Sequence, residues 1–138
     1  ILIDCPPSLG MLTVNALTAC EGVLVPTAAA PFAFKGMEML FDTVRLVRDN
    51  LNPSCHVAGI FLTNFDQRRR IEADFLTHLK ATYSEMFETI IPTDVRLTEL
   101  GYYGDPSIVL GDSRGAIAYG ELAKEVVARC PVQDKEAS

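Results

Sequence analysis

The sequence predicts an α/β fold in which helices lie on both faces of a parallel sheet. Short apolar runs rich in Val, Ile and Leu alternate with segments of helical periodicity, which is the pattern of βαβ units. The apolar runs are continuous, as in strands that are buried on both faces. A hydrophobic fraction of 49% in 138 residues is enough for one core.

The strands are predicted where an apolar run ends at proline, asparagine or aspartate. Four runs fit this description: Ile1–Ile3, Val23–Val25, Val57–Thr63 and Thr89–Ile91. Valine or isoleucine occurs in every one of them, in keeping with the side chains that strands favour.

The helices are predicted from apolar residues at spacings of three and four. Four segments have such spacing or follow a helix-starting signal: Met11–Ala19, Gly36–Leu51, Arg69–Tyr83 and about Gly115–Arg129. The side chains expected to face the core are Met37, Leu40, Phe41, Val44, Val47, Ile71, Phe75, Leu79, Leu122 and Val126.

Charge and composition exclude several classes of protein. The net charge of -6 argues against a general binder of polyanions, so any nucleic-acid contact needs a local basic patch. No apolar run reaches the roughly 18 residues that a membrane span needs. The four cysteines form no CxxC pair, which favours reduced thiols over a metal site.

Polar residues follow each predicted strand. They are Asp4-Cys5-Pro6-Pro7, Pro26-Thr27, Asn64-Phe65-Asp66-Gln67-Arg68 and Pro92-Thr93-Asp94-Val95-Arg96. Any one of these stretches is explained by turn formation alone, since Pro, Asn and Asp are turn residues. Because ligands of parallel sheets gather at the carboxyl ends of the strands, the four together favour a ligand site.

Asp4 fits the role of a Walker B aspartate, which holds Mg²⁺ beside the phosphates of a nucleotide. We expect its carboxylate to be largely buried at the tip of its strand. The prolines that follow end the hydrogen bonding of the strand. A Walker B residue needs a P-loop, G-x-x-x-x-G-K-[ST], and the chain has none. The stretch "GYYGDPSIVLG" has glycines but no lysine, and we interpret it as a loop.

Several motifs together resemble the ParA/Soj partition ATPases, which belong to the deviant Walker A group. They are "ILIDCPPSLGMLTVNALTA", "VLVPTAAAPFAFKGM", "LVRDNLNP", "GIFLTNFDQR", "IIPTDVRLTE" and "GAIAYGELAKEV", in this order over nearly the whole chain. The resemblance implies a P-loop NTPase-like fold that is incomplete here, with the P-loop half upstream. It also implies an ATP-dependent homodimer that binds DNA non-specifically and positions replicated DNA.

The resemblance also assigns site residues. Asp4 matches the catalytic and metal-holding carboxylate for Mg²⁺. Asn64 matches a residue that binds the adenine of ATP, Pro92 one that packs on the adenine ring, and Asp94 lies beside it. Arg68 and Arg96 match arginines implicated in DNA contact, although they equally suit the solvated start of a helix.

The resemblance further implies the partners and the place in the cell. We expect a ParB-like partner protein, a cytoplasmic, nucleoid-associated location and no membrane contact, since the tail lacks a basic amphipathic helix. Residues 1–130 would form the C-terminal part of the nucleotide-binding domain, and residues 131–138 a polar tail.

Alternatives to a partition ATPase remain. One is a relative that positions other cargo with the same ATPase cycle, and another is a non-catalytic interaction module without a P-loop. The family's sheet places the P-loop strand between Ile1–Ile3 and Val23–Val25. We therefore expect the chain to move a strand into that gap, to pair with a second copy or to be part of a longer protein.

Overall fold

The computed structural model describes residues 1–103 and 111–130, without the side chains of residues 100–103. Most of the predicted loop "GYYGDPSIVLG" and the whole predicted tail 131–138 lie outside the described residues. The chain divides into two compact units. Unit 1 comprises Ile1–Val25 and Ala30–Gly59, and unit 2 comprises Pro26–Ala29 and Ile60–Ser138.

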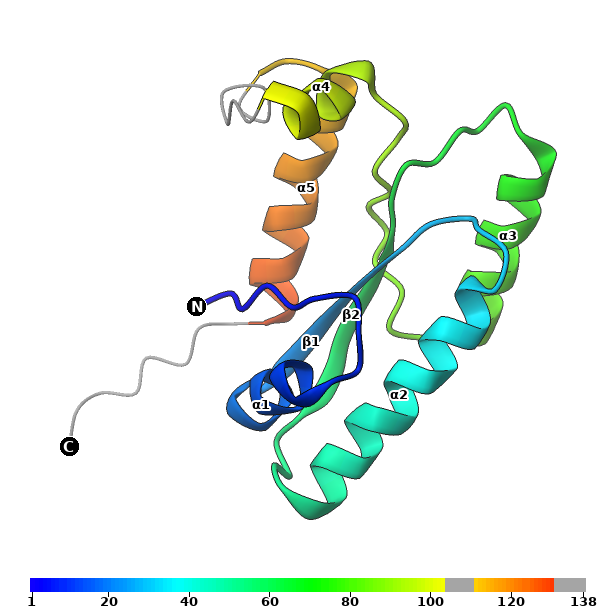
Figure 1. Ribbon diagram of the computed structural model, residues 1–138. Coiled ribbons are helices and arrows are strands. Elements are labelled where there is room, and N and C mark those ends of the chain that lie inside the picture. The colour runs from blue at the N-terminus through cyan, green and yellow to red at the C-terminus, as the bar shows by residue number, and fades with distance from the viewer. Residues whose placement is uncertain (104–110, 131–138) are drawn as a thin grey trace. The chain divides into compact units, whose positions relative to one another are not determined.

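Unit 1 contains two helices, α1 at Met11–Ala19 and α2 at Ala33–Asn50 (Figure 1). Both were predicted from the sequence, α1 with the same bounds. A small core includes residues of both helices and of the start of β2 at His56–Leu62, and its buried members are Leu17, Val44, Val47 and Cys55, which directly precedes β2. The side-chain amide of Asn52 donates to the carbonyl oxygens of Leu17 and Cys20 at the end of α1, at 3.0 and 2.5 Å. The apolar spacing of α2 thus produces the packing that it predicted.

The sheet joins β1 at Gly22–Thr27 to β2 at His56–Leu62, and both strands run through both units. The strands are parallel, since the His56 N–H donates to the Glu21 oxygen at 3.1 Å and the Thr63 N–H donates to the Thr27 oxygen at 2.7 Å. In the predicted run Val23–Val25, Val25 is buried and the two residues before it are half-buried. Beyond that run burial is one-sided, since Thr27 is buried and Pro26 is exposed.

The prediction of a strand at Ile1–Ile3 is wrong. These residues form no strand, and the exposed fractions of Ile1, Leu2 and Ile3 are 121%, 86% and 52%. A strand forms only where its N–H and C=O groups pair with a neighbour, and no described residue pairs with this segment. Asp4 is exposed as well, which corrects the expected burial of its carboxylate. A strand moved into the gap is likewise not seen among the described residues.

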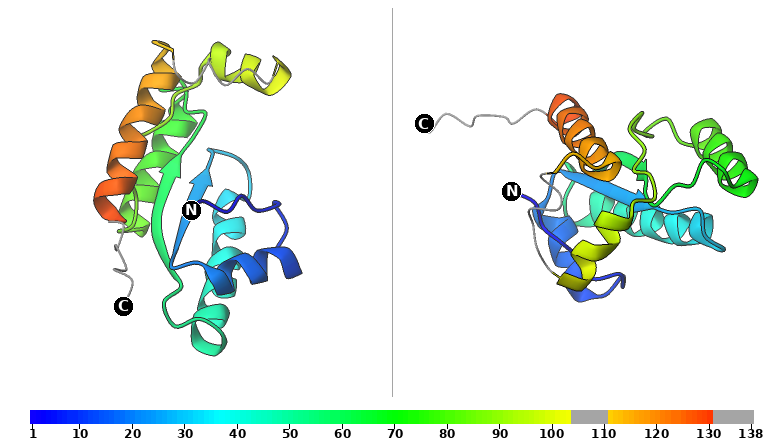
Figure 2. Two further views of the ribbon diagram at one scale, coloured as in Figure 1. Left: turned by 90° about the vertical axis from the view of Figure 1, so that its left-hand side faces the viewer. Right: turned by 90° about the horizontal axis from the view of Figure 1, so that it is seen from above.

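Unit 2 contains three helices, α3 at Arg70–Thr82, α4 at Val95–Tyr103 and α5 at Arg114–Arg129. Two of them match predictions, whereas α4 was not predicted. Figure 2 shows α4 at the N-terminal end of α5. The buried apolar side chains of this unit are Ile60, Leu62, Leu79, Met86, Phe87, Ile91, Ala116 and Leu122. Ile71, expected in the core, is 72% exposed in the first turn of α3, which corrects that prediction.

Residues 85–93 run alongside β2 in the parallel direction (Figure 1). The predicted strand Thr89–Ile91 lies in this segment, but the pairing is limited to isolated bridges between Ile60 and Met86 and between Phe65 and Pro92. The Phe87 N–H donates to the Ile60 carbonyl oxygen at 2.7 Å, and the Ile91 N–H donates to the Leu62 carbonyl oxygen at 2.8 Å. Between these two hydrogen bonds the segment advances by four residues while β2 advances by only two. The segment therefore bulges and forms no regular strand.

The side chain of Glu125 on α5 accepts hydrogen bonds from backbone N–H groups of the bulge. Its carboxylate accepts from the N–H groups of Glu88 and Thr89, at 2.8 and 3.0 Å, and from Arg129 at 2.9 Å. Burial raises the pKa of this carboxyl, but the two backbone donors and Arg129 outweigh burial and lower it. The guanidinium of Arg129 also lies over the ring of Phe87, 4.5 Å from its centroid.

The four cysteines are free thiols. Burial raises the pKa of the Cys55 thiol to about 11, and the neighbouring Cys20 thiol adds to the rise. Cys55 is therefore neutral and unreactive at physiological pH.

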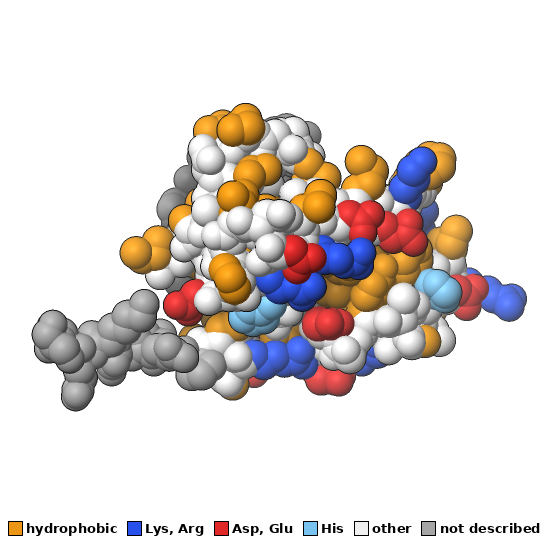
Figure 3. Space-filling view, turned by 90° about the horizontal axis from the view of Figure 1, so that it is seen from below, with side chains coloured by type: hydrophobic (Ala, Val, Ile, Leu, Met, Phe, Trp, Pro, Cys, Tyr) orange, Lys and Arg blue, Asp and Glu red, His pale blue; other side chains and the backbone are white. Residues whose placement is uncertain are grey.

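The surface carries charges of both signs. On the face in Figure 3, basic and acidic side chains lie next to one another among apolar ones. No helix among the described residues is long and apolar enough to cross a membrane.

Candidate functional site

A cavity of about 310 Å³ opens in unit 2, at the ends of β2 and of the parallel segment 85–93. Its lining residues come from these two ends and from α4 and α5: Thr63, Asn64, Pro92, Asp94, Leu97, Thr98 and Tyr119. The volume is at the lower end of the range for small-molecule sites, roughly 300–1,000 Å³. The cavity brings together Asn64, Pro92 and Asp94, the three residues that the family resemblance assigned to a nucleotide.

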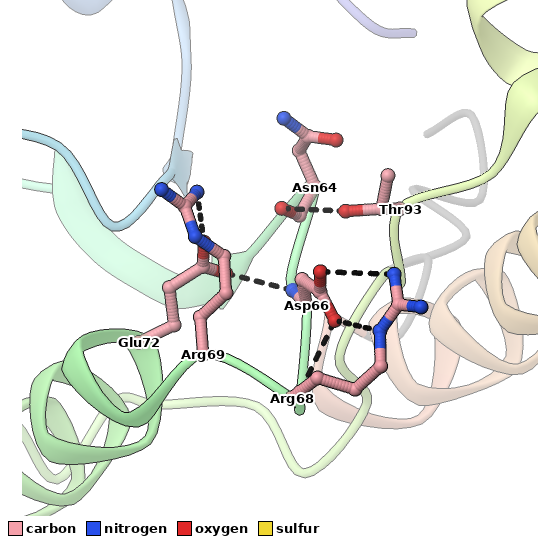
Figure 4. A network of polar contacts seen from close by, with 6 residues as sticks. All are labelled: Asn64, Asp66, Arg68, Arg69, Glu72 and Thr93. Carbon is pink, nitrogen blue, oxygen red and sulfur yellow. Dashed lines mark hydrogen bonds and ion pairs between the residues drawn. The ribbon is translucent and has the colours of Figure 1, made fainter.

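Asn64 is held in a conformation that suits asparagine. Its φ angle is 54°, in the left-handed region that asparagine adopts more readily than most residues. Its carbonyl oxygen accepts a hydrogen bond of 3.1 Å from the Thr93 hydroxyl, which ties the end of β2 to the segment beside it. Figure 4 shows the side-chain amide of Asn64 directed away from this bond. Within the described structure no hydrogen bond to protein occupies that amide, so it is free to bind a ligand.

The loop after Asn64 is fixed by charged groups (Figure 4). The buried carboxylate of Glu72 accepts from the Asp66 N–H at 2.7 Å and from Arg69 at 2.9 Å. Asp66 in turn accepts from Arg68 through both carboxylate oxygens, at 3.0 and 3.1 Å. The side-chain hydrogen bond from Arg68 is the main cause that lowers the pKa of Asp66. The loop is therefore ordered by its own ion pairs before any ligand binds.

Asp94 connects the first turns of two helices. Its Oδ1 atom accepts from the Arg96 N–H of α4 at 2.9 Å, and its Oδ2 atom accepts from the Gly115 N–H of α5 at 2.7 Å. These are the N–H groups that a helix leaves unpaired at its start. The Gly115 bond is the main cause that lowers the pKa of the Asp94 carboxyl, against the opposing effect of burial. Asp94 is thus ionised at neutral pH.

The remaining polar groups of the lining are few. The Thr63 hydroxyl donates to the Thr27 oxygen at 3.1 Å, and the Thr98 hydroxyl donates to the Asp94 carbonyl oxygen at 3.3 Å. That leaves the Asn64 amide and the Tyr119 hydroxyl as the lining side-chain groups without a hydrogen bond in the described structure. Sequence reasoning missed Tyr119, although it lies in the quoted stretch "GAIAYGELAKEV". Only the packing of α5 places it at the cavity.

The other predicted site residues lie outside this cavity. Asp4 belongs to unit 1 and is exposed. Arg68 is 85% exposed in its pair with Asp66, and Arg96 is 59% exposed with its guanidinium 3.4 Å from the Asp112 carboxylate. Each of the two arginines therefore has a carboxylate partner already.

Comparison with protein families and sequences finds similarity along the chain. Residues 1–57 match a family model described as an AAA domain. The chain is 44% identical over 131 residues to the sporulation initiation inhibitor protein Soj of Bacillus subtilis, covering 93% of this chain and 51% of Soj. It is 41% identical over 132 residues to the chromosome partitioning protein ParA of Myxococcus xanthus, covering 94% of this chain and 46% of ParA. The chain thus spans about half the length of the curated relatives it matches.

Among solved structures, the chain is similar to cobyrinic acid a,c-diamide synthase from Mycobacterium smegmatis. The TM-score is 0.68 at 32% identity, covering 88% of this chain and 43% of the synthase. That synthase was crystallised with ADP and magnesium and with an ATP analogue and magnesium. The likeness confirms the predicted fold class, an incomplete P-loop NTPase-like arrangement of parallel strands and helices.

Proposed function

We propose, from the confirmed resemblance of this chain to the ParA/Soj family, that it is the adenine-binding part of an ATP-dependent DNA-partition ATPase. The observation that supports this most is the cavity itself. It unites Asn64 with Pro92 and Asp94, which lie 28 and 30 positions further along the chain by their numbers. Relatives named as chromosome partitioning proteins support the biological role.

The cavity suits an uncharged planar heterocycle. The Asn64 amide offers a donor and an acceptor side by side, as the edge of adenine requires. Pro92 and Leu97 supply apolar surface for the faces of a ring. The one ionised lining group, Asp94, is occupied by two backbone N–H groups. The lining therefore favours a base over a phosphate group.

Magnesium would be held through Asp4 and the phosphates of ATP. A carboxylate oxygen is a ligand that Mg²⁺ prefers, and the ion usually keeps several waters and binds substrate phosphates. In the described residues no cluster of three His, Cys, Asp or Glu side chains is placed to hold a metal. Asp4 would thus supply one ligand in the complete protein, where the bound ion neutralises charge on the phosphates.

The resemblance to the ParA/Soj family also suggests how the complete protein would assemble and what it would bind. The complete protein would dimerise with ATP, bind DNA non-specifically through Arg68 and Arg96, respond to a ParB-like partner and act in the cytoplasm on the nucleoid. A relative with the same fold but other cargo is the second candidate. The likeness to a cobyrinic acid synthase shows how one fold serves different reactions.

The adenine site is tested by Asn64→Asp. The change preserves shape and tolerance of positive φ but replaces the amide donors by acceptor oxygens. Adenosine binding to the chain, followed by amide shifts in NMR titrations, should weaken by roughly tenfold, the equivalent of about 1.4 kcal/mol. Gln67→Glu makes the same chemical change at an exposed position of the same loop and should bind adenosine as the wild type does. Wild-type cavity amides that do not respond to adenosine would refute the site.

DNA binding is tested by replacing Arg68 and Arg96 together with alanine in the complete protein. In a plot of the logarithm of DNA affinity against the logarithm of salt concentration, each phosphate that a cationic side chain neutralises contributes about -0.9 to the slope. The slope of the double variant should therefore be less steep by that amount for each arginine that binds a phosphate. Replacing Arg45 and Arg48, which are also exposed and paired with carboxylates, is the control and should leave the slope unchanged. Equal slopes for both double variants would make Arg68 and Arg96 ordinary surface residues.

A further inference from the structure

Asp94 lines the cavity, yet its carboxylate is committed to protein. One oxygen accepts from the N–H of Arg96 at 2.9 Å and the other from the N–H of Gly115 at 2.7 Å. The two donors belong to the first turns of two successive helices, α4 and α5. A single side chain therefore ties the start of α4 to the start of α5.

The two helix starts lie very close to each other at this point. A Cβ atom placed on Gly115 would come within 2.7 Å of Leu97 Cγ and 3.0 Å of Asp94 Cβ. Leu97 and Thr98 of α4 and Tyr119 of α5 line the cavity from the two helices that Asp94 joins. The relative position of these two helix starts consequently sets the shape of that wall.

We infer that Asp94 is a positioning residue, which holds the cavity wall of Leu97, Thr98 and Tyr119 in place for a base and does not itself bind the base. This inference rests on the adenine site proposed above. The polar side chains that meet the base are then the Asn64 amide and the Tyr119 hydroxyl.

The test uses Asp94→Ser in the isotopically labelled chain. Serine is a good helix cap, so the Arg96 N–H should keep a partner while the Gly115 N–H loses its own and shifts in the NMR spectrum. Adenosine affinity, measured where both proteins are fully folded, should fall roughly fivefold or more, because the start of α5 is no longer tied to the start of α4. Asp74→Ser removes an exposed carboxylate of α3 and should change neither property.

The outcomes separate the inference from the function on which it rests. Adenosine binding by Asp94→Ser with wild-type affinity would overturn the inference and leave the adenine site standing. Absence of adenosine binding in the wild type would overturn the adenine site, and the inference with it. If Asp94→Ser does not fold, Asp94→Asn decides, because its single side-chain oxygen replaces the two that accept from Arg96 and Gly115. It should weaken adenosine binding, and wild-type affinity would overturn the inference.

Discussion

Glu72 is the residue on which the order of the Asn64 loop most depends. Its side chain is 5% exposed, and its two oxygens accept from the Asp66 N–H and from Arg69 at 2.7 and 2.9 Å. A buried carboxylate is tolerated only where such partners replace water. The backbone that carries Asn64 and Asp66 is thus anchored to the first turn of α3.

Glu72→Gln should destabilise the protein by about 1–2 kcal/mol, because the amide keeps one acceptor oxygen but loses the charge that Arg69 binds. Thermal or urea unfolding of the purified variant measures this loss. Glu38→Gln, an exposed position on α2, is the control and should unfold as the wild type does. Equal stability of Glu72→Gln and wild type would show that the loop does not depend on this ion pair.

At the scale of the elements, α4 and α5 lie in close contact at Gly115. The space for a side chain there is filled by Leu97 and Asp94, whereas a Cβ atom on Gly120 in the same helix would meet nothing within 4 Å. The two glycines lie in the same helix but have different surroundings. Alanine substitutions at the two positions therefore distinguish the effect of packing against α4 from the effect of helix propensity.

Gly115→Ala should destabilise the protein by about 1–3 kcal/mol, since overpacking at a close helix contact outweighs the better helix propensity of alanine. Gly120→Ala should stabilise it by up to about 1 kcal/mol, because propensity acts there alone. Urea midpoints of the two variants measure both effects. Similar gains for both alanines would show that the contact between α4 and α5 is loose.

The elements also show what the sequence predicts and what it does not. Apolar spacing predicted α2, α3 and α5 to within a few residues, and α1 was predicted as a short helix after the prolines. Most of the marked side chains are buried or half-buried, with Ile71 of α3 as the exception. Apolar spacing did not predict α4, although Asp94 directly before Val95 is an N-cap signal. The glycines and tyrosines after it favoured a loop instead.

Strands were predicted less well, because a strand depends on its neighbour. The run Ile1–Ile3 has suitable side chains but no backbone partner among the described residues, and it stays exposed. The segment 85–93 has β2 as a partner but bulges toward Glu125, a residue 36 positions beyond Thr89 that local sequence does not reveal. At the site, the strand-end rule pointed to the stretches that hold Asn64, Pro92 and Asp94, and the resemblance assigned these three to a nucleotide. The three line one cavity, whereas the place of Tyr119 in it depended on helix packing.

For the whole molecule, the distribution of charge decides which part of a nucleotide the chain can bind. The chain has 18 acidic and 12 basic residues and a net charge of -6. No lysine or arginine lines the described cavity. The arginines of the neighbouring run are each paired, Arg68 with Asp66, Arg69 with Glu72 and Arg70 with Asp74. The sequence contains no P-loop pattern to hold phosphates.

The 138-residue chain should consequently bind ATP no more tightly than adenosine. The phosphates gain no cationic partner at the cavity, and the acidic chain repels them at low ionic strength. Parallel NMR titrations with adenosine, AMP and ATP measure the three affinities. The affinity should stay the same or fall as the number of phosphates increases. Added salt should reduce any such weakening because it screens the repulsion. Micromolar binding of ATP together with weak binding of adenosine would mean that the chain holds phosphates elsewhere, and that the cavity at Asn64 is not where the nucleotide is recognised.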